Sequence, residues 1–182
     1  MHKPFVTRQV AALAVRRRHD TVEVLMVTSR RRRRWVLPKG MIDVGLTARD
    51  SAAKEAWEEA GVTGIVGRRS IGRYRYGKSG RHGLMPCVVE VYPLRVTRVS
   101  PAWPEQRQRR RAWQLLDQVT DTASDGQLVH LLHRFAGRLG AVDARLPPGR
   151  EDSGTHGRIE APGRVGRRRR PAAVVRRKTA RP

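Results

Sequence analysis

The chain has few cysteines, few acidic residues and no long apolar segment. Its 182 residues include one cysteine, Cys87, which excludes an internal disulfide and a cysteine metal cluster and indicates a reducing compartment. The longest apolar run near the start, residues 10–15, is too short to span a bilayer, and nothing before it is typical of a secretory signal. We therefore expect a cytoplasmic protein with no membrane partner.

The shortage of acidic residues gives the chain a strong positive charge. There are 16 Asp and Glu against 39 Lys and Arg, which makes a net charge of +23. A field of this sign concentrates phosphates, nucleic acids and other polyanions near the protein. The charge therefore predicts a class of partner without selecting one member of it.

The composition changes near residue 140. Residues 141–182 hold 12 Lys and Arg against 4 Asp and Glu, are rich in Gly and Pro, and have few large apolar residues. We predict one folded domain over residues 1–139 and a basic, disordered tail over residues 140–182. The tail could bind nucleic acid nonspecifically, with an affinity that falls as salt rises, or it could have no function.

Three of the few acidic residues are close together in the sequence. Glu55, Glu58 and Glu59 are spaced i, i+3 and i+4, so a helix places their carboxylates on one face within about one turn. Like charges at this distance repel and either raise their own pKa values or attract a cation such as Mg²⁺, which prefers oxygen ligands. The alternative is a helix face that contacts only solvent. The cluster is therefore a candidate metal site.

The residues around this cluster predict a helix that follows a bent loop. Thr47 is a suitable N-cap with Asp50 three residues later, and Gly61 is a suitable helix end. Residues 35–37 read as the end of a strand, and the prolines and glycines of residues 38–45 predict a bend. The expected order is strand, glycine loop, acidic helix and stop.

This order and spacing resemble the Nudix hydrolases. The family's box consists of G, five residues, E, seven residues, and then R, E, an apolar residue, any residue, E, E, any residue, G and an apolar residue. Gly40 occupies the first position, and KEAWEEAGV over residues 54–62 occupies the last nine. Leu46 replaces the first Glu of the box, and Lys54 replaces its Arg. Lys keeps the charge of Arg but lacks its planar fork.

The resemblance implies a fold, a reaction and a set of site residues. The fold is of the α/β class, a Nudix-type α/β/α sandwich around a mixed β-sheet. The reaction is Mg²⁺- or Mn²⁺-dependent hydrolysis of a diphosphate linkage in a nucleoside polyphosphate, a dinucleoside polyphosphate or an inositol pyrophosphate. The resemblance makes Glu55 and Glu59 the main metal ligands, Glu58 a ligand or base, and the Gly40 carbonyl a further donor. Glu105 could complete the set, although a solvated loop glutamate is the alternative.

A run of five arginines, residues 30–34, comes just before the glycine loop. We expect Arg33, Arg34 and Lys39 to contact substrate phosphates, because they are near Gly40 in sequence. The segment SRRRRRWVLPKG, together with Leu46, resembles most the diphosphoinositol polyphosphate phosphohydrolase branch and its bacterial relatives. Leu46 and Lys54 favour the alternative of a catalytically impaired Nudix-shaped module that binds RNA or other polyanions. The sequence does not indicate an oligomeric state.

The rest of the chain predicts the other elements of the sheet. We expect a hairpin over residues 9–16 and 21–29 with one buried face, strands over residues 62–66 and 71–76, and an amphipathic helix around residues 128–135 on the side away from the site. Because of its prolines, the segment 84–96 should be an edge or bulged strand. GRYRYGKS, residues 72–79, matches a phosphate-binding loop, but no buried strand precedes it and no helix can follow. We therefore interpret residues 77–83 as a turn.

Overall fold

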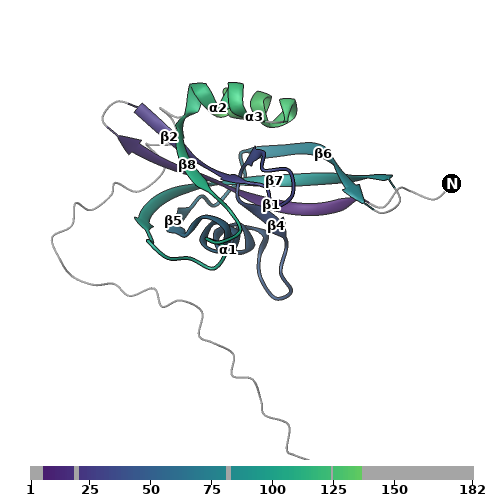
Figure 1. Cartoon of the computed structure of the whole chain (residues 1–182), viewed down its shortest axis with the longest axis horizontal. Coiled ribbons are helices and arrows are strands. Elements are labelled where there is room, and N and C mark those ends of the chain that lie inside the picture. Colours follow the sequence, from purple (N-terminus) through teal and green to yellow (C-terminus); the bar gives the residue numbers. More distant parts are fainter. Residues whose placement is uncertain (1–5, 19–20, 81–82, 124, 137–182) are drawn as a thin grey trace, which may run out of the picture. The chain divides into compact units, whose positions relative to one another are not determined.

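The computed structural model describes residues 6–18, 21–80, 83–123 and 125–136 (Figure 1). Its strands are β1 (Thr7–Arg18), β2 (Thr21–Thr28), β3 (Trp35–Val36), β4 (Lys39–Met41), β5 (Val62–Val66), β6 (Gly72–Gly80), β7 (Gly83–Val99) and β8 (Arg111–Leu115). Its helices are α1 (Ala48–Ala60), α2 (Leu116–Thr122) and α3 (Gly126–Ala136).

The strands form one mixed sheet with β1 near its centre. Strand β1 pairs antiparallel with β2 and β4 and parallel with β7. Strand β7 also pairs with β5 and β6, and β2 also pairs with β3 and β8. The predicted β1–β2 hairpin is confirmed, but residues 10–15 of β1 are buried on both faces of the sheet rather than one.

The two faces of the sheet have separate cores. Ala11, Leu13 and Val15 pack with residues of α2 and α3, while the alternating residues Val10, Ala12 and Ala14 pack with α1. The helices therefore lie on opposite sides of the sheet, as Figure 1 shows. This arrangement is the α/β/α sandwich predicted from the sequence.

Helix α1 has the predicted ends. The Thr47 side chain accepts a hydrogen bond from the Asp50 N–H at 3.1 Å. Gly61 adopts a left-handed conformation with φ of 65°, and its N–H bonds back to the carbonyl oxygens of Ala56 and Trp57. The helix predicted near residues 128–135 is α3, whereas the short strand β4 was not predicted.

Strand β7 is bulged, as expected, but it does not lie at the edge of the sheet. Its pairing with β5 shifts between Thr63 and Gly64. Pro93 is tolerated because it falls where β7 changes partner: Val91 pairs with the start of β6 and Leu94 with the end of β5. Pro86 comes before Cys87, where the pairing with β1 begins.

The segment that matches a phosphate-binding loop lies in β6, in a regular ladder with β7. This confirms that it is not such a loop. Residues 77–80 are also paired, so the predicted turn is shorter than residues 77–83. No helix of the described residues is long and apolar enough to cross a membrane. The predicted tail lies outside the described residues.

Candidate active site

Strand β4 brings the glycine loop against the acidic face of α1. Gly40 pairs with Val10 of β1, and a Cβ atom on Gly40 would lie 1.8 Å from Oε1 of Glu55. Only glycine lets the backbone pass this close to the carboxylate. Burial, followed by the negative charges of Glu59 and Glu58, raises the pKa of Glu55 to about 7.

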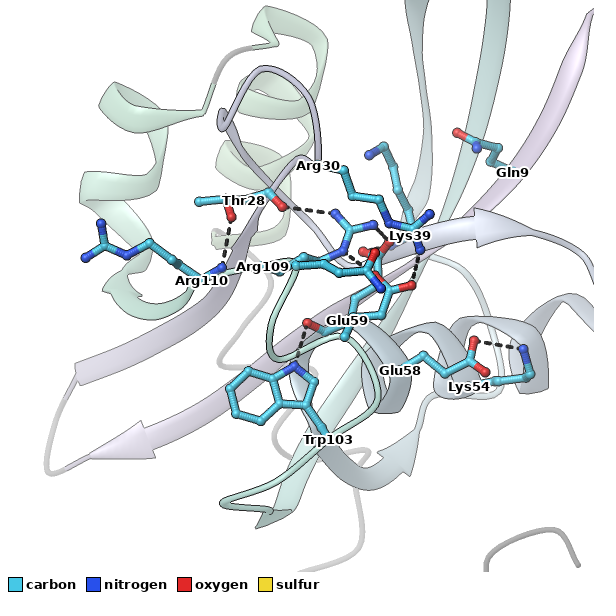
Figure 2. Close-up of polar contacts among 12 residues, drawn as sticks. Gln9, Thr28, Arg30, Lys39, Lys54, Glu58, Glu59, Trp103, Arg109 and Arg110 are labelled. Atoms are coloured by element: carbon cyan, nitrogen blue, oxygen red, sulfur yellow. Dashed lines mark hydrogen bonds and ion pairs between the residues drawn. The ribbon is translucent and has the colours of Figure 1, made fainter. Parts of the chain in front are cut away.

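Glu59 is the most buried acid of the site, with 4% of its surface exposed. Its Oε2 accepts a hydrogen bond from the Lys39 backbone N–H at 3.1 Å, and its Oε1 forms an ion pair with Arg109. Burial raises the pKa of Glu59 by more than the charges of Arg109 and Lys39 lower it. Figure 2 shows Arg30, Lys39 and Arg109 gathered around this carboxylate.

Glu58 points to a different partner. Its carboxylate accepts a hydrogen bond from Lys54 Nζ at 2.8 Å (Figure 2). The same Nζ lies 3.2 Å from Asp43 Oδ2. The three predicted glutamates are therefore on one helix face but do not converge. Among the described residues, no group of three or more Asp, Glu, His or Cys side chains could hold one metal ion.

The loop before β8 adds two residues to the site. Glu105 accepts a hydrogen bond from Arg109 Nε at 2.6 Å and forms an ion pair with Arg30. Its side chain is 15% exposed, so it is not a solvated loop glutamate. Burial raises the pKa of Glu105, but hydrogen bonds from Arg109 and Arg30 outweigh that effect and lower it. Arg109 was not predicted, because nothing in the run RQRRR distinguishes it from its neighbours.

A clasp holds this loop against the end of α1. Trp103 Nε1 donates to the Glu59 carbonyl at 3.2 Å, and the Arg111 guanidinium lies over the Trp103 ring at 3.9 Å. Arg111 also donates to the carbonyl oxygens of Ala60 and Ser100. The clasp fixes the position of Glu105 and Arg109 relative to Glu59.

The three predicted phosphate contacts lie in different environments. Lys39 is next to Glu59 in space; its Nζ is 5.6 Å from the centre of the Tyr76 ring, and burial lowers its pKa.

The two arginines are at the surface. Arg33 is exposed and donates a hydrogen bond to the Gln108 carbonyl at 2.8 Å. Arg34 is also exposed, and its backbone N–H bonds Ser29 Oγ. Arg30, at the start of this run, forms an ion pair with Glu105.

The donor set fits a hard divalent cation. Glu55 and Glu59 are carboxylates whose pKa values are raised by burial, and both lie beside the β4 backbone, so a cation would relieve an unfavourable charge. Glu58 could join them only by turning away from Lys54. The site therefore offers two carboxylates directly and a third after a side-chain rotation.

Comparison with known proteins identifies the family. Residues 7–137 match the NUDIX domain. Mitochondrial Nudix hydrolase 18 of Arabidopsis thaliana is 29% identical over 133 residues, which cover 73% of each chain. Nudix hydrolase 12 of the same plant, also mitochondrial, is 38% identical over 98 residues, or 52% of this chain and 48% of its own. A C. elegans Ap4A hydrolase in a binary complex has a TM-score of 0.58 at 18% identity, with 74% of this chain and 98% of that one covered.

The chain belongs to the Nudix family, and its fold is the Nudix fold. The family match places it among the Nudix hydrolases, a class of pyrophosphohydrolases that act on diphosphate-containing substrates. The chain spans between 48% and 73% of the length of the two plant relatives.

Proposed function

We propose that this chain hydrolyses the diphosphate linkage of a highly phosphorylated small molecule with the help of Mg²⁺ or Mn²⁺. The candidate substrates are nucleoside polyphosphates, dinucleoside polyphosphates and inositol pyrophosphates. The observation that carries this proposal is the contact between two arginine-rich loops beside Glu59. Arg30 bonds Glu105, and Arg33 donates to Gln108, so residues 30–34 lie against the loop that carries Glu105 and Arg109.

In this proposal the acidic residues bind the metal ion and the basic residues bind the phosphate groups. Glu55 and Glu59 are the main metal ligands of the proposal, Glu58 is a ligand or base, and the Gly40 carbonyl is an additional donor. A divalent ion bound there supplies positive charge to phosphate oxygens and lowers the pKa of a bound water. The Lys39 backbone N–H fixes the orientation of Glu59. Lys39, Arg33 and Arg34 bind and orient the phosphate groups.

The arginine run also supports a finer assignment. In the diphosphoinositol polyphosphate phosphohydrolase branch, which the sequence resembles, several phosphates must be neutralised at once. Exposed arginines at the edge of the acidic site suit such a substrate. The branch assignment is part of the proposal.

A second candidate function is a Nudix-shaped module that binds RNA or other polyanions without turnover. One observation favours it: Glu58 is held by Lys54 and Glu59 by Arg109, so each acid already has a cationic partner. Leu46 and Lys54 also favour this alternative, because they replace the first Glu and the Arg of the family's box.

Incubation with Mg²⁺ or Mn²⁺ and a panel of capped nucleotides, dinucleoside polyphosphates and inositol pyrophosphates separates the two functions. We expect release of phosphate or a monophosphate, and a loss of kcat of about 10²-fold or more in Glu59→Gln. Glu23→Gln is the matched control, because Glu23 forms an ion pair with Arg16 at the opposite end of β2 from Thr28. Tight, salt-sensitive binding with no product would support the binding module instead.

A further inference from the structure

Arg109 is the central contact of the site, although it lies outside the family's box. All three of its guanidinium nitrogens are bonded: Nε to Glu105, Nη1 to the Thr28 carbonyl and Nη2 to Glu59 (Figure 2). Its side chain is 9% exposed. Arg109 therefore connects the end of β2, helix α1 and the loop before β8 through one buried cation.

This cation competes with a metal ion for Glu59, because it is paired with one of the two carboxylate oxygens. Glu59 is the carboxylate for which both positive charges compete, and two cations about 4 Å apart inside a protein repel strongly. An arginine does not lose its proton in proteins, so the conflict cannot be relieved by neutralising Arg109. The repulsion is relieved if the guanidinium exchanges Glu59 for another anionic partner.

A diphosphate provides such a partner. Guanidinium groups form paired hydrogen bonds with phosphate oxygens, and these are among the strongest polar contacts in proteins. A phosphate bound at the edge of the site could therefore take over the hydrogen bonds that Arg109 now makes to Glu59.

We infer that Arg109 is an internal counter-cation that occupies Glu59 and Glu105 in the absence of substrate and is displaced when a phosphate group binds. The inference rests on the proposed function, because it concerns the metal ligands named there. It makes the binding of the metal ion and of the phosphate mutually favourable, since each removes an obstacle to the other. Arg109 is in this sense a positioning residue for Glu59.

The test measures Mn²⁺ affinity directly, with no substrate present, by titration followed by electron paramagnetic resonance of free Mn²⁺. We expect Arg109→Gln to bind Mn²⁺ about tenfold or more tightly than the wild type, because the competing charge is gone. Inorganic phosphate should tighten Mn²⁺ binding by the wild type and have less effect on Arg109→Gln. The melting temperature gives a second readout: Arg109→Gln should melt lower than the wild type in chelator and recover more of its melting temperature with Mn²⁺.

Arg110→Gln is the matched control. It removes the same charge from the adjacent residue, which is exposed and whose side chain points away from Glu59 in Figure 2. Its Mn²⁺ affinity should equal that of the wild type. If Arg110→Gln also tightens binding, the effect is one of overall charge and the inference is wrong.

A second uncharged variant keeps the test valid if Arg109→Gln does not fold. Arg109→Met keeps a long apolar stem and removes the competing charge, so it should also bind Mn²⁺ more tightly than the wild type. A Mn²⁺ affinity no greater than that of the wild type, in whichever variant folds, overturns the inference. If the wild type still hydrolyses the substrate panel, the proposed function survives that result. If the wild type takes up no Mn²⁺ and releases no product, both fail.

Discussion

Helices α1 and α3 cover opposite faces of one sheet but meet it with different side chains. The buried apolar residues of α1 are Ala52, Ala56 and Ala60, whereas α3 buries Leu128, Leu131, Leu132 and Phe135. Small residues let α1 lie close to the sheet, so Glu55 and Glu59 reach the backbone of β4. Large residues on α3 fill a core instead. One face therefore positions charged groups, and the other supplies apolar burial.

The largest expected effect is a loss of stability on the α3 face. Leu132 is fully buried in the core beneath α2 and α3, so Leu132→Ala should lower the free energy of unfolding by about 2–5 kcal/mol. Urea unfolding measures this. The kcat/KM of the molecules that remain folded should match the wild type, and a loss of kcat/KM in folded protein would show that the two faces are not separate.

At Gly40, on the side of the sheet that α1 covers, we expect a loss of activity with little change in stability. Gly40→Ala places a methyl group where the Glu55 carboxylate now lies, and the side chain must rotate away. Misplacing a reactive group by about 1 Å can lower kcat about 10²-fold, while the unfolding midpoint should change little. Steady-state kinetics and urea unfolding separate these outcomes. Gly126→Ala at the start of α3 is the control, since a Cβ there meets nothing within 4 Å and activity should be unchanged.

The next expected effect depends on pH and comes from Glu55. Its pKa is raised from 4.5 to about 7, so between these values the folded chain holds a proton that the unfolded chain has lost. The contribution of this group to the free energy of unfolding therefore falls as pH rises through this range. Urea midpoints at pH 5 and pH 7 in metal-free buffer should differ less in Glu55→Gln than in the wild type. Equal pH dependence in both would contradict the raised pKa.

The smallest effect is expected at Leu46, where the family's box has a glutamate. Leu46 is 41% exposed, and Lys54 already bonds Asp43 and Glu58. Leu46→Glu should therefore change the free energy of unfolding by less than about 0.5 kcal/mol and leave kcat close to the wild type. A large gain in kcat would show that the missing carboxylate limits this enzyme.

The fold could be predicted because residues 40–62 resemble the Nudix box, and the helix of the site could be predicted from local patterns. Thr47 and Gly61 define the ends of α1 through backbone conformation, and the spacing of Glu55, Glu58 and Glu59 places them on one face. The directions of those side chains could not be predicted, since they depend on distant partners. Lys54 draws Glu58 aside, and Arg109, fifty residues after Glu59, is paired with Glu59 only in the folded chain.

Strand β7 illustrates the same limit. Its two prolines suggested an edge or a bulge, because a missing N–H is least costly there. The structure instead aligns Pro93 with the junction of two partner strands, an arrangement that involves β5 and β6 as well as β7. Such a register depends on tertiary pairing and has no local signature.

The clasp formed by Trp103 and Arg111 determines which of the two loops beside the site can be altered. It attaches the loop before β8 to the end of α1, so changes in that loop would also disturb the acids. The arginine turn of residues 30–34 is held to that loop by contacts at its surface, including the Arg33 bond to Gln108. Exchanging the residues of this turn other than Arg30 is therefore the route by which substrate selectivity could be redesigned while Glu105 keeps its ion pair with Arg30.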